Sequence, residues 1–249
     1  MVSFYMQRSF SSPALVLRVR SSGESNREAF FLSEAEGIIS ATLFGGPKSR
    51  LRSHVSPFNS GLLFSYRDPA KDFRKVSDFD VRSWRPGLRE LYERSETATL
   101  IAGAILAGHG GGGAWEKALG LANAALDALE NASEDQCERI LLHFLWNWAG
   151  LLDNRNDPGR CASCSCEAAA DGILWFIPGE GFLCKNCALQ VHSAGGKTAY
   201  SGFRPGAVLG PGARRWLLAV QDRSPAELVR YNLDTASLGE LRGLIKQLF

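Results

Sequence analysis

The chain has no long hydrophobic run. Its most apolar segment, residues 140–148, is interrupted by His143 and Asn147 and is too short to span a bilayer. The first twelve residues are polar and lack the apolar core of a secretory signal. These absences favour a cytoplasmic protein without a membrane partner, in which the six cysteines stay reduced and are available as metal ligands.

The net charge is also small. The sequence contains 28 Lys and Arg against 26 Asp and Glu, so the chain as a whole is not a polycation. The distribution is uneven, because residues 1–82 carry 12 basic against 8 acidic side chains, whereas residues 83–249 carry 16 against 18. We therefore expect any phosphate-binding surface in the first third of the chain.

No catalytic constellation is recognisable. The sequence contains four scattered histidines, His54, His109, His143 and His192. None of them stands beside an evident nucleophile or a carboxylate pair in the sequence. The residues 196–198, Gly-Lys-Thr, resemble the end of a phosphate-binding loop, but the full motif needs a glycine where Val191 stands. We therefore expect a protein that is not an enzyme.

The first eighty residues have the pattern of β-structure, with short alternating segments between turn residues. The expected strands are Ala14–Arg20, Glu28–Ser33, Gly37–Phe44, Ser60–Tyr66 and Phe73–Val81. In the first strand, Leu15, Leu17 and Val19 are expected to share one face. Five short strands with a glycine-rich, basic connection at residues 45–52 favour a small closed barrel, because closure removes unpaired strand edges.

The pattern changes to helical spacing near residue 84. The expected helices are Leu88–Leu106, Trp115–Leu129 and one that opens at Ser133 and ends near Leu152. Capping boxes at Ser224–Glu227 and Ser237–Glu240 predict two further helices. The sequence thus predicts an α+β protein with an N-terminal five-stranded OB-fold barrel in residues 1–83 and a helical domain in residues 84–249.

A cysteine-rich insert at residues 160–188 interrupts the helical domain. Cys161 and Cys164 form one Cys-x-x-Cys pair, and Cys184 and Cys187 form a second pair after nineteen intervening residues. Two such turns supply four thiolates to one tetrahedral Zn²⁺, and a predicted hairpin at residues 172–183 lies between them. Because four thiolates leave no position for substrate or water, we expect one structural Zn²⁺ per chain.

The ligand set remains open at two positions. Cys166 is an alternative to Cys164, since Cys-x-Cys pairs also chelate metals, and His192 is an alternative ligand after the second pair. Cys137 is distant in sequence and is expected to be packed. A zinc-dependent deaminase would need an open metal position and a His/Cys/Cys ligand pattern, which the neighbourhood of Glu167 lacks. Thiols without a metal are the remaining alternative.

Basic and aromatic residues of the barrel are the candidates for DNA binding, because small OB barrels combine cationic grooves with stacking platforms. The candidate cations are Arg18, Arg20, Lys48, Arg50, Arg52, Lys71, Arg74 and Lys75. The available aromatic residues are Phe30, Phe31, Phe44, Phe58, Phe64 and Tyr66. Most of these rings are expected in the barrel core, and none is assigned as a platform.

Taken in order, these segments resemble the bacterial DNA repair protein family RecO. The resemblance rests on Ala14–Ser25 (ALVLRVRSSGES), Glu36–Lys48 (EGIISATLFGGPK), the pair Pro57-Phe58 and Lys75–Asp80 (KVSDFD). The additional Cys166 is not part of the usual family pattern, and residues 237–249 resemble the family's ending only loosely.

The resemblance implies a recombination mediator of the cytoplasm and nucleoid. Such proteins bind single- and double-stranded DNA, anneal complementary strands, and act with RecR and RecF to load RecA onto DNA coated by single-strand-binding protein (SSB). They also bind the acidic, Phe-ended C-terminal tail of SSB through the helical domain. One candidate tail site comprises Arg214, Arg215 and Trp216, and another combines Arg139 with the Ile140–Trp148 helix. The competing interpretation is a zinc-ribbon scaffold for protein interactions that does not bind DNA directly.

Overall fold

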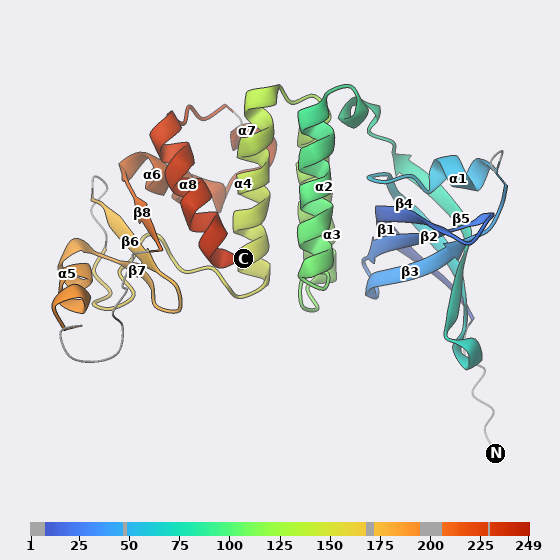
Figure 1. The fold of residues 1–249 in the computed structure, drawn as a ribbon, viewed down its shortest axis with the longest axis horizontal. Helices are drawn as coiled ribbons and strands as arrows, with labels where there is room; N and C mark the ends of the chain where they lie inside the picture. The colour runs from blue at the N-terminus through green and yellow to red at the C-terminus, as the bar shows by residue number, and fades with distance from the viewer. Residues whose placement is uncertain (1–7, 47–48, 168–171, 195–205, 229) are drawn as a thin grey trace, which may run out of the picture. The chain divides into compact units, whose positions relative to one another are not determined.

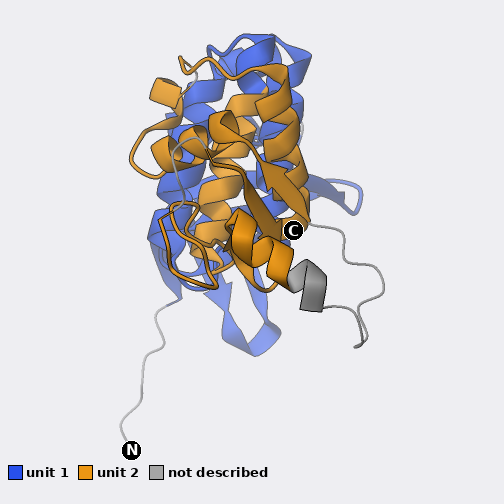
Figure 2. Cartoon of the chain, turned by 90° about the vertical axis from the view of Figure 1, so that its left-hand side faces the viewer, with its two compact units in different colours: residues 1–137 blue, residues 138–249 orange. Residues whose placement is uncertain are grey.

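The structure, a computed structural model, describes residues 8–46, 49–167, 172–194, 206–228 and 230–249 (Figure 1). The chain divides into two compact units, residues 1–137 and residues 138–249 (Figure 2). Within the described ranges, no helix has the length and apolar character needed to cross a membrane.

Five strands of the first unit form a closed barrel in the order β1-β2-β3-β5-β4. They are β1 (Ser9–Ser22), β2 (Asn26–Ser33), β3 (Gly37–Leu43), β4 (Ser60–Asp68) and β5 (Phe73–Ser83). All neighbours are antiparallel except β3 and β5, which meet in parallel at the single pair Thr42 and Lys75. The predicted five-stranded barrel is confirmed. β1 begins earlier than predicted because its serine-rich start pairs with β4, whereas its second half pairs with β2.

A bulge in β1 decides which side chains point outward. The register between β1 and β2 shifts between Val16 and Arg18, so the alternation of faces restarts there. Val16 lies in the barrel core, with Val19 packed against that core, while Arg18 is exposed. The prediction that Leu15, Leu17 and Val19 share a face is therefore wrong, because strict alternation does not anticipate a bulge.

Helices α2 (Tyr92–Ala107) and α3 (Trp115–Leu129) of the first unit pack against the barrel strands β1 and β2. The turn between β2 and β3 approaches α3 closely. Gly37 has a φ of 72°, and a Cβ atom there would lie 2.6 Å from Nε1 of Trp115. This position therefore requires glycine. The last barrel strand, β5, ends at Ser83, whereas the compact unit continues to Cys137, because these helices pack on the barrel. The domain boundary after residue 83 stays a prediction.

Short elements connect the strands and helices of the first unit. They are α1 (Arg50–His54) and the 3₁₀ turns η1 (Pro69–Lys71) and η2 (Pro86–Arg89). α1 was not predicted, since it spans five residues and its N-cap Ser49 makes no side-chain capping hydrogen bond. α2 begins later than predicted, because the chain first passes through η2.

The second unit combines helices with a small sheet of order β7-β6-β8. Its elements are α4 (Glu134–Leu151), which begins at the end of the first unit, β6 (Leu174–Ile177), β7 (Gly181–Leu183), α5 (Lys185–Ala194), β8 (Ala207–Leu209), α6 (Pro211–Val220), α7 (Pro225–Leu228) and α8 (Thr235–Leu248). Trp146, Phe182 and Trp216 are among the bulky residues of its core. The predicted β6–β7 hairpin is confirmed, and β8 adds an unpredicted third strand.

The helix-capping predictions have different outcomes. The backbone N–H of Ser224 donates to the Glu227 carboxylate at 2.8 Å, which confirms that box. In α8, however, Asp234 is the N-cap, and its carboxylate accepts from the backbone N–H of Ser237 at 2.7 Å. The predicted box at Ser237–Glu240 is therefore wrong, because the helix begins three residues before its predicted first turn.

Candidate functional site

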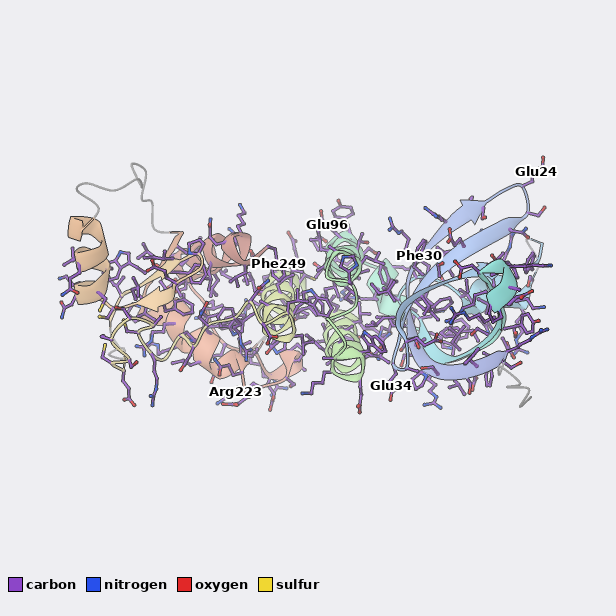
Figure 3. All side chains as sticks on the ribbon, turned by 90° about the horizontal axis from the view of Figure 1, so that it is seen from below. Glu24, Phe30, Glu34, Glu96, Arg223 and Phe249 are labelled. Atoms are coloured by element: carbon purple, nitrogen blue, oxygen red, sulfur yellow. The ribbon has the colours of Figure 1, made fainter. Side chains whose placement is uncertain are left out.

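The first group of candidate cations lies on the outer face of the β1–β2 hairpin, whose tip carries Glu24 (Figure 3). The guanidinium carbons of Arg18 and Arg20 lie 5.4 and 5.1 Å from the ring centroid of Phe30. Arg20 also forms an ion pair with Glu28 at 2.6 Å. Within the described part of the chain, Arg18 has no such carboxylate partner.

The second group surrounds helix α1. Arg50 donates from Nε to Nε2 of His54 at 3.2 Å, and Arg52 donates to the backbone carbonyl of Ser25. Both arginines therefore have local partners that carry no negative charge, so their cationic charge is not neutralised. Lys48 lies outside the described residues.

The third group belongs to the β4–β5 hairpin. Arg74 makes a bidentate ion pair with Glu36, with nitrogen–oxygen distances of 2.9 and 2.6 Å, and its side chain is only 10% exposed. Lys71 and Lys75 are exposed, and the ammonium of Lys75 lies 5.3 Å from the ring centroid of Tyr66. Of these three cations, Arg74 is neutralised, whereas both lysines remain available to an anion.

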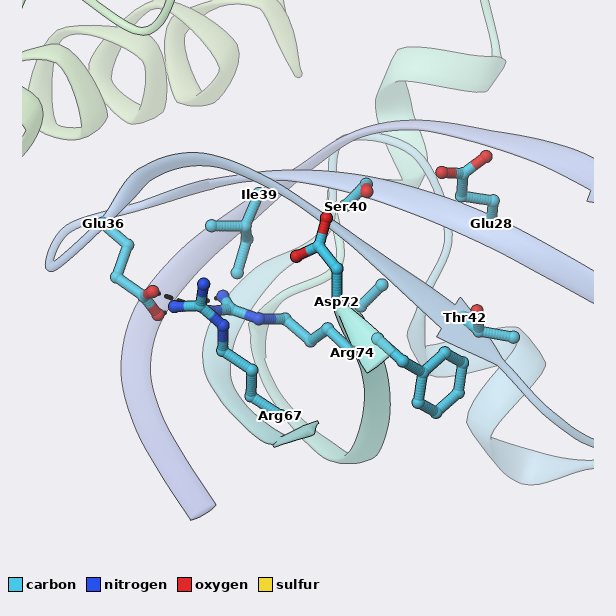
Figure 4. A pocket seen from close by; sticks show the side chains of 10 residues that line it. Glu28, Glu36, Ile39, Ser40, Thr42, Arg67, Asp72 and Arg74 are labelled. Carbon is cyan, nitrogen blue, oxygen red and sulfur yellow. Dashed lines mark hydrogen bonds and ion pairs between the residues drawn. The ribbon is translucent and has the colours of Figure 1, made fainter. Parts of the chain in front are cut away.

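A cavity of about 370 Å³ lies beside the parallel junction of β3 and β5 (Figure 4). Its walls carry Arg67 and Arg74 together with Glu28, Glu36 and Asp72. Arg67 is not among the candidate cations predicted from the sequence. The signal was nevertheless present, because a hairpin between the predicted strands 60–66 and 73–81 places Arg67 opposite Arg74, as the observed register does.

The cysteine cluster is the second candidate site. The sulfur atoms of Cys161, Cys164, Cys166 and Cys184 all lie within 4.8 Å of one another. The distance from the Cys164 sulfur is 3.2 Å to that of Cys166 and 3.9 Å to that of Cys184. None of the six cysteines forms a disulfide. Four sulfurs in this arrangement are able to hold a metal ion.

Hydrogen bonds from backbone N–H groups favour the thiolate form of Cys161. Burial raises the pKa of its thiol, but hydrogen bonds from backbone N–H groups, led by that of Cys184, lower it to about 6. The N–H of Cys184 lies 3.3 Å from the Cys161 sulfur. Because metals bind the thiolate form, this arrangement suits a cysteine ligand.

The observed cluster differs in one member from the predicted ligand set. It contains Cys166, whereas the predicted ligand Cys187 lies outside the group of mutually close sulfurs. Cys187 is nevertheless adjacent, because it is buried in the same small hydrophobic cluster as Cys161, against which Cys184 also packs. The site therefore offers five thiols for four coordination positions. The side chain of the alternative ligand His192 lies outside the described residues.

Hydrophobic residues around the cluster form a small core of their own, which includes Ile177, Leu183 and Ala188. Cys161 and Cys187 are buried in the same core. Cys137 lies in the other compact unit, is buried, and places its sulfur 3.4 Å from the carbonyl oxygen of Ser133. This confirms the expectation that Cys137 is a packed residue.

The first candidate site for the SSB tail is not a continuous surface. Trp216 is 1% exposed, and Arg214 is buried with its Nε donating to the carbonyl of Pro158 at 3.0 Å. Only Arg215 of this group is exposed. In the second candidate, Arg139 donates from Nη1 to the carbonyl of Tyr231 at 3.1 Å.

The barrel segment of the chain is similar in sequence to a known protein family. The sequence profile of a family described as "Recombination protein O N terminal" matches residues 6–83. The match covers all five strands of the barrel and stops where β5 ends. No curated protein matches the chain.

Proposed function

We propose that the barrel binds DNA, because residues 6–83 match the N-terminal domain of the recombination protein O family, and this match supports a role in DNA recombination and repair. In this proposal the protein binds single- and double-stranded DNA and anneals complementary strands. It acts with RecR to load RecA onto SSB-coated DNA, and the second unit binds the SSB tail. It does this in the cytoplasm, at the nucleoid.

One observation carries the proposal: the matched barrel exposes cations that no carboxylate of the described chain neutralises. Arg18, Lys71 and Lys75 are all exposed and lie outside every ion pair of the described residues. Small OB barrels use such groups to contact the phosphate backbone of a single strand.

Strand annealing requires no bond chemistry. Two complementary strands repel each other through their phosphates, and exposed arginine and lysine side chains reduce that repulsion while base pairs form. A protein with this role needs charged contacts on an accessible surface and no general acid, base or nucleophile. We therefore propose that the protein is not an enzyme.

The cysteine cluster fits a structural Zn²⁺, which would supply folding free energy to the insert. Cys161, Cys164 and Cys184 would hold the ion, with Cys166 or Cys187 as the fourth ligand. Saturation by four thiolates leaves no open position for catalysis. The insert would need the metal because its own hydrophobic core is small.

A strand-annealing assay with and without SSB tests the proposed function. The protein should accelerate annealing, and its affinity for single strands should fall steeply as salt rises, because binding releases counterions from phosphate. Replacing Arg18, Lys71 and Lys75 together by alanine should weaken binding. A matched control removes three exposed cations of the second unit that belong to neither candidate tail site: Arg223, Arg230 and Lys246.

The competing function is a protein-interaction scaffold without direct DNA binding. The neutralisation of Arg20 by Glu28 and of Arg74 by Glu36 favours it, since both ion pairs reduce the positive charge of the barrel. Salt-independent or undetectable DNA binding, together with retained binding of RecR, would replace our proposal with this scaffold.

A further inference from the structure

An exposed aromatic ring stands beside the cavity of the barrel. Phe44 directly follows β3 and is 46% exposed. Phe73, the first residue of β5, lines the cavity and lies against Phe44, with ring centroids 6.1 Å apart and planes inclined by 56°. Phe73 therefore contacts the Phe44 ring, while nearly half of the Phe44 residue remains exposed and accessible to a planar ligand.

The cavity next to these rings is lined by Arg67, a cation without an ion-pair partner among the described residues, and by the hydroxyl-bearing residues Ser40 and Thr42. The guanidinium of Arg67 lies next to that of Arg74 and near the Glu36 carboxylate (Figure 4). Glu36 is occupied by its bidentate pair with Arg74. Arg67 is exposed and has no ion-pair partner among the described residues, so its charge is available to an anion.

The acidic residues of the cavity limit what can enter it. Glu28 and Asp72 line the same space; Glu28 is paired with Arg20, whereas the Asp72 carboxylate repels a phosphate placed beside it. Both carboxylates are, however, good acceptors for the amino groups of nucleobases. The lining thus suits a ligand with one anionic group and a flat, hydrogen-bonding ring.

We propose that Phe44, supported by Phe73, and Arg67 form a subsite for one nucleotide of a single DNA strand. The base stacks on the exposed part of the Phe44 ring, with its edge toward the cavity, and the phosphate contacts Arg67. This inference rests on the proposed DNA binding and adds to it a preference for unpaired bases. In a duplex, each base is already stacked and paired, so it is not free to leave the helix for this ring.

Phe44→Leu separates stacking from folding, since leucine keeps the apolar contact with Phe73 but has no aromatic face. The probes are a single-stranded oligonucleotide of roughly 15 nucleotides, an abasic strand of equal length, and a duplex. We expect Phe44→Leu to weaken single-strand binding about tenfold, because one stacked base contributes a factor of roughly 5 to 150. Binding to the abasic strand and to the duplex should not change, and Phe44→Trp should restore the single-strand affinity.

Phe64→Leu is the matched control, because Phe64 is 38% exposed on β4 and does not line the cavity. It should leave the affinity for all three probes unchanged. Arg67→Ala should weaken binding to the normal and abasic strands by equal factors, as expected of a phosphate contact. Thermal melting verifies that each variant is folded.

The outcomes separate this inference from the function on which it rests. A wild-type protein that binds none of the probes removes the proposed DNA binding itself. If the wild-type protein binds single strands but Phe44→Leu binds them equally well, DNA binding stands and the stacking subsite is overturned. Equal losses on the normal and abasic strands would likewise overturn it, because they would show that Phe44 contributes without contacting a base.

Discussion

Nε of Arg85 lies 2.6 Å from Oδ1 of Asp127, and this pair connects the end of the barrel to helix α3. The Arg85 side chain is 1% exposed, whereas that of Asp127 is 58% exposed. Arg85 also donates to the carbonyl of Phe58, to Oγ of Ser60 and to Oδ1 of Asn123. A single buried guanidinium thus fastens the β3–β4 connection and α3 to the end of β5, which places the barrel and α3 in one compact unit.

Replacing Arg85 by alanine should lower the free energy of unfolding by about 3 kcal/mol, because it leaves several buried acceptors without a donor. Asp127→Ala should cost only about 1 kcal/mol, since this carboxylate is largely exposed and water replaces it. Urea unfolding followed by circular dichroism measures both values. Equal losses for the two variants would contradict the assignment of Arg85 as the central donor.

The five thiols of the insert predict a characteristic pattern of zinc loss. Cys161→Ser and Cys184→Ser should each abolish stoichiometric zinc, since these residues belong to both alternative ligand sets. Cys166→Ser and Cys187→Ser should each retain one zinc per chain, because the remaining thiol completes the tetrahedron. The double variant should lose the metal. Metal analysis after dialysis against a weak chelator provides the measurement.

The single variants also identify the ligand set if the thiols are not interchangeable. Loss of zinc from Cys187→Ser alone would support the two Cys-x-x-Cys pairs. Loss from Cys166→Ser alone would support the cluster formed by Cys161, Cys164, Cys166 and Cys184. Cys137→Ser is the control and should retain zinc, since this residue lies in the other compact unit.

Salt titrations should distinguish barrel cations that contact DNA from a barrel cation whose ion pair stabilises the fold. Arg18→Ala and Lys75→Ala should each reduce the slope of log affinity against log salt by about 0.7 for single strands. Arg74→Ala should instead lower the free energy of unfolding by about 2 kcal/mol with little change in that slope, because Arg74 is held by Glu36. Salt titrations and urea unfolding measure the two effects. A changed slope for Arg74→Ala would place Arg74 at the DNA interface.

His143 should make stability depend on pH. Burial lowers the pKa of this imidazole below its ordinary value of 6.5, while a hydrogen bond with the Arg223 carbonyl acts in the opposite direction. The unfolded chain therefore takes up a proton near pH 6.5 more readily than the folded chain. The associated stability is fully present above pH 6.5 and declines as the pH falls below it, until the folded pKa is reached.

His143→Gln supplies the comparison for this pH dependence, because its amide is able to donate to the Arg223 carbonyl and does not titrate. Unfolding free energies measured at about pH 7.5 and about pH 5.5 should differ more for the wild-type protein than for the variant. An identical difference in both proteins would show that His143 is not responsible. The comparison cancels the titration of the cysteine cluster, which is common to both proteins.

Much of the fold follows from local patterns. Alternating apolar residues place all five barrel strands, and the helical spacing of residues 115–129 gives α3 with its observed bounds. Features that depend on contacts between distant segments were not predictable in this way. The bulge between Val16 and Arg18, for example, is set by the pairing of β1 with two different partners. β8 likewise becomes a strand only because β6 offers it an edge.

The candidate functional sites, too, were predictable only where they depend on local sequence patterns. Cysteine spacing alone indicates a metal site, since each pair is local to one turn, but it does not reveal that Cys166 lies among the clustered sulfurs. Basic residues indicate a phosphate-binding barrel, yet their number does not reveal which charges are neutralised. Arg74 is paired with Glu36, which is 38 residues away in sequence.

By itself, the sequence determined the order of the barrel strands and of helices α2 to α4, the closed five-stranded barrel, the cysteine-rich insert and the resemblance to RecO, because periodicity and motif spacing express short-range constraints. The tertiary structure decided which side chains are available. It buried Arg85 as a connector, removed Trp216 from the surface, and brought Arg67, Phe73 and β3 around one cavity. Burial and ion pairing depend on what the folded chain brings together across long sequence separations, and no local pattern specifies that.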